Sequence, residues 1–119
     1  MGTILVADDE RMLRRVISRV LSRAGYDVLL AEDGQEAVNV FVENRERVSL
    51  VILDMNMPKL NGVGAATQIF ELSPSTPVLI ASGDDEKTVL NHFVDRKPDG
   101  LIQKPFVAAT LVEAVEKHL

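Results

Sequence analysis

The chain of 119 residues contains no cysteine and fewer basic than acidic side chains. The absence of cysteine excludes disulfides, thiolate metal sites and thiol nucleophiles. A net charge of −5 argues against nucleic acid as a direct partner, because phosphate binding needs a basic surface. The nearest approach to such a surface is a set of arginines at positions 11, 14, 15, 19 and 23, which we expect on the solvated face of one helix.

Long apolar runs, a signal peptide and linkers are also absent. No run could cross a bilayer, and the N-terminus lacks the basic and hydrophobic regions of a secretory signal, so we expect a soluble, cytoplasmic protein that does not insert into membranes. No Gly-x-Gly-x-x-Gly follows the first apolar run, which argues against dinucleotide binding. No low-complexity segment divides the chain, and its length suits one domain.

Short apolar runs alternate with longer helical patterns, which predicts an open parallel sheet. The runs show little polar alternation, as expected for strands covered on both faces, and the helical patterns repeat apolar residues every three or four positions. Strands are expected at residues 3–7, 27–31, 49–53, 77–81 and 100–103. Helices are expected at residues 10–24, 35–45, 62–72, 84–95 and 106–118. Right-handed crossovers then give an α/β fold of the doubly wound (βα)5 type.

Charged side chains directly follow three of the apolar runs. Asp8 and Asp9 follow the first run, Asp54 follows the third, and Lys104 with Pro105 follows the fifth. Because the carboxyl ends of parallel strands gather at one edge of a sheet, these side chains are expected to share a pocket.

The acidic residues at this edge indicate a bound cation. Carboxylates at a helix N-terminus repel phosphate, and converging carboxylates cannot all stay ionised without a countercharge. A hard divalent ion such as Mg²⁺, or Mn²⁺, prefers oxygen ligands and sites that a substrate phosphate completes. A cation, an ammonium group and a carboxylate together suit transfer of a phosphoryl group to the carboxylate.

Four short motifs together resemble the receiver domains of two-component response regulators. They are Asp8-Asp9-Glu10, residues 53–58 around Asp54, Ser82-Gly83 and Lys104-Pro105-Phe106, each at the end of a predicted strand or directly after it. The similarity covers the whole chain, so residues 1–119 are expected to form a single receiver domain. It implies the CheY-like, flavodoxin-like sheet order 2-1-3-4-5. Ser82-Gly83 and residues 103–106 are also similar to receivers of hybrid sensor histidine kinases.

The resemblance implies an acceptor and a metal site. Asp54 would accept a phosphoryl group from the phosphohistidine of a histidine kinase or of a histidine phosphotransfer protein. Asp9, Asp54 and the backbone carbonyl of Asn56 would hold Mg²⁺ directly. Asp8 would act mostly through coordinated water.

The resemblance also implies a switch. Lys104 would pair with the phosphoryl oxygens, and Ser82 would move to hydrogen-bond the phosphoryl group. A downstream protein would bind the face formed by the fourth helix, the fifth strand and the fifth helix. The chain would then be a phosphorelay signalling module and not a turnover enzyme.

Three positions depart from the family pattern or modify it. Leu101 occupies a position where many receivers carry an aromatic ring, which predicts weaker or different coupling to the output face. Asn56 and Asp84 are expected to tune the rate at which the phosphoryl group is lost, in a direction that the sequence does not give.

Other interpretations remain. Taken singly, Asp8 or Asp9 could be a helix N-cap, and Ser82-Gly83 a plain strand-to-helix turn. An aspartate-nucleophile phosphatase would also use Mg²⁺ and a lysine, but it typically carries a second acid two residues after the nucleophile, where this chain has Asn56. A receiver-like interaction domain that works without phosphorylation is the third interpretation.

Overall fold

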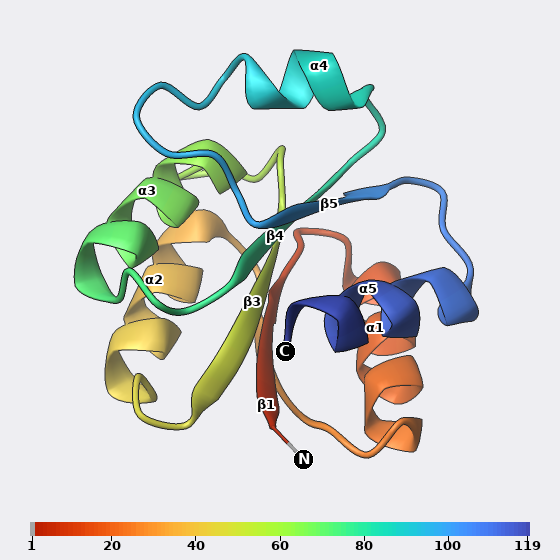
Figure 1. The fold of residues 1–119 in the computed structure, drawn as a ribbon. Coiled ribbons are helices and arrows are strands. Elements are labelled where there is room, and N and C mark those ends of the chain that lie inside the picture. The colour runs from red at the N-terminus through yellow and green to blue at the C-terminus, as the bar shows by residue number, and fades with distance from the viewer. Residues whose placement is uncertain (1) are drawn as a thin grey trace.

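Five strands and five helices alternate along residues 2–119, the part of the chain that the computed structural model describes (Figure 1). The strands are β1 (Thr3–Ala7), β2 (Asp27–Ala31), β3 (Val48–Asp54), β4 (Val78–Ser82) and β5 (Gly100–Gln103). The helices are α1 (Arg11–Arg23), α2 (Gly34–Glu43), α3 (Gly62–Leu72), α4 (Glu86–Leu90) and α5 (Ala108–His118). All strand pairs are parallel, in the order β2-β1-β3-β4-β5, which confirms the predicted fold and sheet order.

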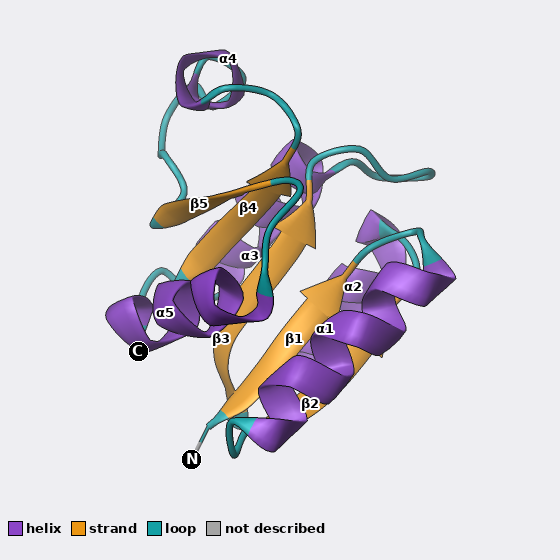
Figure 2. Ribbon diagram, turned by 90° about the vertical axis from the view of Figure 1, so that its right-hand side faces the viewer, coloured by secondary structure: helices purple, strands orange, loops and turns teal. Residues whose placement is uncertain are grey.

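The sheet separates two apolar cores. Helices α1 and α5 cover one face, and α2 and α3 cover the other (Figure 2). Along β1, Ile4 and Val6 point to the α1/α5 core while Leu5 and Ala7 point to the α2/α3 core, because successive side chains of a strand alternate between faces. All four are at most 1% exposed, so the central strands are covered on both faces as their apolar runs predict.

Strand β2 does not follow that prediction. Val28 and Leu29 are only partly buried, and Leu30 is 38% exposed. Because β2 lies at the edge of the sheet and pairs with β1 alone, the helices cover it less completely than the central strands.

The apolar residues that repeat every three or four positions along α1 are not all buried. Ile17 and Leu21 are buried, but Met12 is 70% and Val16 is 51% exposed. Adjacent residues of a helix point about 100° apart. When the side chains at positions 17 and 21 face the sheet, those at positions 12 and 16 therefore point towards solvent.

Helix α4 ends at Leu90, although the sequence pattern predicts a helix to residue 95. The Leu90 carbonyl accepts from Phe93 N at 3.1 Å, and the Lys97 ammonium group donates to the carbonyls of Leu90 and Phe93 at 2.8 and 2.9 Å, so these bonds hold the turn that follows the helix. Phe93 is buried in the α2/α3 core, which draws the segment after the helix towards the sheet.

Strands β3 and β4 each extend one residue beyond their expected ends. Asp54 and Ser82 are consequently the last residues of strands and not the first residues of loops. Strand pairing therefore fixes the Cα positions of Asp54 and Ser82 at the edge of the sheet where the loops meet. None of the helices within residues 2–119 has the length and apolarity that a membrane span requires.

Candidate functional site

Three carboxylates meet at the carboxyl ends of β1 and β3. These strands are neighbours, with Ala7 paired to Leu53, so the residues that follow extend side by side. One carboxylate oxygen from each of Asp8, Asp9 and Asp54 lies within 4.8 Å of the others. Asp8 and Asp54 are buried, whereas Asp9 is exposed. The structure therefore brings together the acidic residues that the sequence pattern places at one edge of the sheet.

Lys104 lies between the two buried carboxylates. Its Nζ donates to Asp8 Oδ2 and to Asp54 Oδ1, both at 3.0 Å. The backbone fixes its position, because Lys104 N continues the strand pairing by donating to the Ser82 carbonyl at 2.8 Å. Charge-assisted hydrogen bonds of this kind are stronger than neutral ones, so the ammonium group is the main counterion of the cluster.

Burial and crowding act on the ionisation of this cluster. Burial raises the pKa of Asp54, the Lys104 hydrogen bond opposes that shift, and the negative charges of Asp8 and Asp9 add to it. Burial alone would lower the pKa of Lys104, but its bonds to Asp8 and Asp54 outweigh that effect and raise its pKa. Lys104 therefore stays charged, and one ammonium group incompletely compensates three acids.

The donor set fits a hard divalent cation. Three carboxylates converge from β3 and the β1–α1 loop, and the exposed Asp9 leaves the site open to solvent on one side. Mg²⁺ is commonly bound through one or two carboxylates with several waters retained, which an open, oxygen-rich site allows. A cation here would also relieve the repulsion that raises the pKa of Asp54.

The β3–α3 loop carries Asn56, which is exposed two residues beyond Asp54. The loop is closed by a hydrogen bond of 2.9 Å from Gly62 N to the Met55 carbonyl. It also rests on the first residue of α2, because a Cβ added to Gly34 would come within 1.8 Å of the Leu60 carbonyl oxygen. Glycine is thus required at position 34 for this loop to reach its place.

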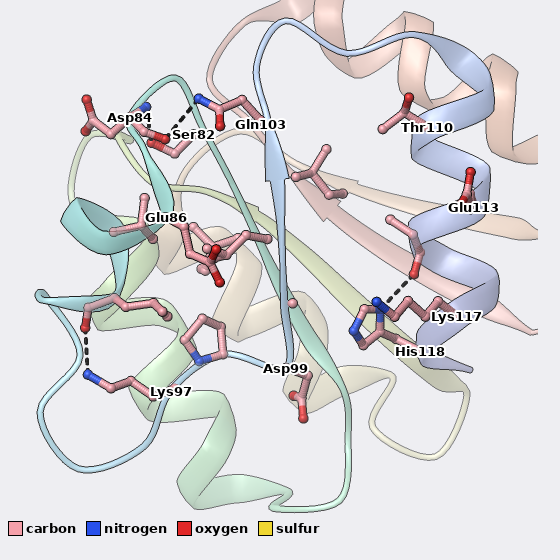
Figure 3. A pocket seen from close by; sticks show the side chains of 18 residues that line it. Ser82, Asp84, Glu86, Lys97, Asp99, Gln103, Thr110, Glu113, Lys117 and His118 are labelled. Atoms are coloured by element: carbon pink, nitrogen blue, oxygen red, sulfur yellow. Dashed lines mark hydrogen bonds between the residues drawn. The ribbon is translucent and has the colours of Figure 1, made fainter.

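Ser82 has a different partner from the acidic residues. Its Oγ accepts a hydrogen bond of 3.0 Å from Asp84 N, and the side chain is buried at the end of β4. Gln103, at the end of β5, donates from Nε2 to the carbonyls of Gly83 and Asp84 at 3.3 and 3.2 Å. Figure 3 shows Ser82, Asp84 and Gln103 grouped at one end of a groove. The start of the β4–α4 loop is therefore held by two side chains.

Arg14 and Gln103 contact loops of the site, although the sequence pattern assigns neither of them a role there. Arg14 was expected on a solvated face, but its side chain is only 11% exposed. Its Nη1 donates to the Asp8 carbonyl at 2.7 Å. The sequence feature that could have indicated this contact is the position of Arg14 one turn into α1, because a long side chain there points back over the preceding loop.

Comparison with known proteins identifies the family. The family model described as the response regulator receiver domain matches residues 4–116, a range that includes the acidic cluster and Lys104. The chain belongs to the response regulator receiver family. The resemblance of the four sequence motifs to receiver domains is thereby confirmed.

Several relatives of this receiver domain show the range of proteins that contain one. The autoinducer 1 sensor kinase/phosphatase LuxN of Vibrio campbellii is 36% identical over 103 residues, which cover 87% of this chain but 12% of LuxN. The chemotaxis protein CheY of Thermotoga maritima is 28% identical over 115 residues, covering 96% of this chain and 94% of CheY. A receiver domain protein from Clostridium thermocellum has a similar solved structure, with a TM-score of 0.91, 30% identity and coverage of 99% and 94%. Receivers therefore occur both in long sensor kinases and in proteins of this length.

Receiver domains are regulatory modules of two-component systems and not turnover enzymes. Domains of this family bind Mg²⁺ in an acidic pocket, and the cluster of Asp8, Asp9 and Asp54 is a pocket of that kind.

Proposed function

We propose that this receiver domain is the phosphoacceptor module of a phosphorelay and that Asp54 receives the phosphoryl group. The donor would be the phosphohistidine of a histidine kinase or of a histidine phosphotransfer protein. The N–P bond breaks with its electron pair left on the imidazole, and an O–P bond forms to the Asp54 carboxylate. The observation that carries the proposal is Lys104 Nζ at 3.0 Å from both Asp8 and Asp54, beside a third carboxylate.

Each group in the pocket has a task in this transfer. Asp9, Asp54 and the Asn56 carbonyl would hold Mg²⁺ directly, with Asp8 acting through water, and the bound ion supplies charge neutralisation for the phosphoryl oxygens. The Lys104 ammonium group, which donates to the Asp54 carboxylate in this structure, would donate to the new phosphoryl oxygens after transfer. Asn56 supplies no acid for hydrolysis of small phosphate esters, which favours a stable acceptor over a phosphatase.

Phosphorylation would change the β4–α4 loop. For the Ser82 hydroxyl to bond a phosphoryl group on Asp54, it must give up the hydrogen bond from Asp84 N. Gln103 holds the carbonyls of the same loop, so movement of the loop also disturbs the end of β5. Asn56 and Asp84 lie on the two loops beside the acceptor and are the proposed determinants of how long the phosphoryl group persists.

The output would be read on the face formed by α4, β5 and α5. This face contains a groove of about 580 Å³ that Ser82 and Leu101 both help to line (Figure 3). The residues that line it carry both signs of charge, including Glu86 and Lys117. Ser82 therefore connects the phosphorylation site to the groove where we propose that a downstream protein binds. Leu101, with no aromatic ring to reorient, would give this face a smaller response than an aromatic residue.

The direct test is to incubate the protein with Mg²⁺ and acetyl phosphate and to measure its intact mass. A gain of one phosphoryl group is expected, and it should be absent from Asp54→Asn and in the presence of a chelator. Ser82→Ala should still be phosphorylated, because Ser82 acts after transfer. If neither acetyl phosphate nor a phosphorylated histidine donor labels the unaltered protein, the phosphoacceptor proposal is wrong and a phosphorylation-independent interaction domain is favoured.

Exposed apolar side chains beside the pocket support a docking site for the donor. Met12 is 70% and Val16 51% exposed on α1, which begins two residues after Asp9. Clustered exposed apolar residues commonly mark interaction surfaces. A partner that brings its phosphohistidine to Asp54 would cover this part of α1.

Met12→Ser is therefore expected to slow transfer from a phosphohistidine protein by about tenfold while leaving labelling by acetyl phosphate unchanged, since loss of an interface anchor costs more than about 1 kcal/mol. Time courses with both donors measure the effect. Val94→Ser is the matched control, because Val94 is 91% exposed but lies after α4, away from α1. Equal slowing with acetyl phosphate would instead assign Met12 to the pocket itself.

A further inference from the structure

Arg14 is buried to a degree that is unusual for an arginine near a helix N-terminus. Its side chain is 11% exposed, whereas the neighbouring Arg11 and Arg15 are exposed. Cations are favoured at helix C-termini and disfavoured at N-termini, so the dipole of α1 does not explain this position. A specific contact must hold the guanidinium in place.

That contact is the Asp8 carbonyl. Arg14 Nη1 donates to it at 2.7 Å, while Nη2 lies 3.4 Å from Glu32 Oε1. The Glu32 side chain is 69% exposed, and exposed ion pairs contribute little. The short bond to the main chain is therefore the stronger of the two contacts.

The Asp8 residue is restrained at each of its polar groups. Its N–H donates to the Ala31 carbonyl at 3.2 Å, Oδ1 accepts from Glu10 N at 2.9 Å, and Oδ2 accepts from Lys104 at 3.0 Å. Arg14 holds the remaining group, the carbonyl oxygen. That oxygen lies in the planar peptide that joins Asp8 to Asp9. Fixing it fixes the N–Cα bond of Asp9 and so limits the directions in which the Asp9 side chain can leave the backbone.

We propose that Arg14 is a positioning residue for the divalent cation site. By holding the Asp8–Asp9 peptide, it keeps the exposed Asp9 carboxylate within 4.8 Å of the Asp8 and Asp54 carboxylates. Residues that orient metal ligands from behind commonly contribute about 10-fold to 100-fold in metal affinity. The inference rests on the proposed Mg²⁺ site but not on phosphoryl transfer.

Charge and geometry predict opposite results when Arg14 is replaced. The guanidinium is positive and close to the acidic cluster, so its charge alone opposes a divalent cation, and removing it would tighten binding. Its hydrogen bond organises the ligands, and removing that bond would weaken binding. The sign of the change in affinity therefore distinguishes a positioning role from a merely electrostatic one.

The test is titration of the protein with Mg²⁺ alone by calorimetry, without a phosphodonor and well below the unfolding temperature. Arg14→Met is expected to weaken Mg²⁺ binding about tenfold, and Arg14→Lys, which keeps a donor and the charge, should restore most of it. Arg14→Gln is too short to reach the carbonyl, so it should behave like Arg14→Met and replaces it if that variant does not fold. Glu32→Gln is the control, because it removes the exposed ion pair and should leave affinity unchanged.

Equal or tighter Mg²⁺ binding by Arg14→Met and Arg14→Gln would overturn the positioning role. Absence of Mg²⁺ binding to the unaltered protein would overturn it as well, because there would be no site to organise. If Mg²⁺ binds with the expected dependence on Arg14 but Asp54 is never phosphorylated, the proposed function fails while the positioning role stands.

Discussion

Asp54→Asn is expected to make the metal-free protein more stable at neutral pH while it abolishes phosphorylation. Burial and the neighbouring Asp8 and Asp9 raise the pKa of Asp54, against the opposing bond from Lys104. The folded protein therefore binds this proton more tightly than the unfolded chain does, and ionisation of Asp54 at neutral pH costs stability. A neutral side chain of the same shape removes that cost, which we expect to be about 1 kcal/mol, or a few degrees in Tm.

The pH dependence of this gain has a defined sign. Below the ordinary aspartate value of 3.8, Asp54 is protonated in both states and the parent and the variant should be equally stable. The cost to the parent develops as the pH rises from 3.8 through the raised pKa of the folded protein, and it is complete above that pKa. Thermal unfolding in a chelator across this range measures the difference. A parent more stable than Asp54→Asn at pH 7 would contradict the prediction.

Asp85→Asn provides a control of opposite sign. The Asp85 carboxylate caps α4 by accepting from Thr88 N at 2.8 Å, and that bond lowers the pKa of Asp85. Its ionised form therefore stabilises the fold above the ordinary value, and this contribution is lost as the pH falls through the lowered pKa. The same chemical change at Asp85 should consequently give no gain at neutral pH.

The sequence predicts the acidic pocket because the pocket depends mainly on where strands end. A buried parallel strand appears as a short apolar run, and the first polar residue after it lies at the sheet edge whatever the surrounding loops do. This local rule places Asp8 and Asp54 within one residue of their observed positions. The order of the strands is not a local property, and it came from the family resemblance.

Other features depend on contacts that no local pattern contains. Exposure of Leu30 follows from the edge position of β2, which is set by topology and not by its own residues. The turn after α4 is held by Lys97, which folds back onto the carbonyl of Leu90. Helical periodicity gives the direction of a Cβ atom, but the long side chain of Arg14 bends back to a carbonyl six residues earlier. Long polar side chains are thus the least predictable part of this site.

Lys104→Met is expected to cause a large loss of stability that depends on metal. The substitution leaves Asp8, 2% exposed, and Asp54, 7% exposed, facing each other without the ammonium group between them. Breaking a fully buried ion pair costs about 3–5 kcal/mol, and because Lys104 itself is 20% exposed we expect about 2–3 kcal/mol in a chelator at pH 7. A bound divalent cation supplies replacement charge, so saturating Mg²⁺ should recover most of this loss.

The pH dependence of the Lys104→Met effect follows from the same contacts. Bonds to Asp8 and Asp54 raise the pKa of Lys104 above 10.5, so its contribution to stability is fully present below 10.5 and is lost as the pH rises through the raised value. At low pH the loss in the variant should shrink, because the carboxylates take up protons and no longer repel. Urea denaturation with and without Mg²⁺ measures each case.

Lys97→Met, which removes an ammonium group that bonds only to carbonyls among the described residues, should show a smaller loss of stability that Mg²⁺ does not change. If Lys104→Met lost no more stability than Lys97→Met in a chelator, Lys104 would not be the main counterion of the two buried carboxylates.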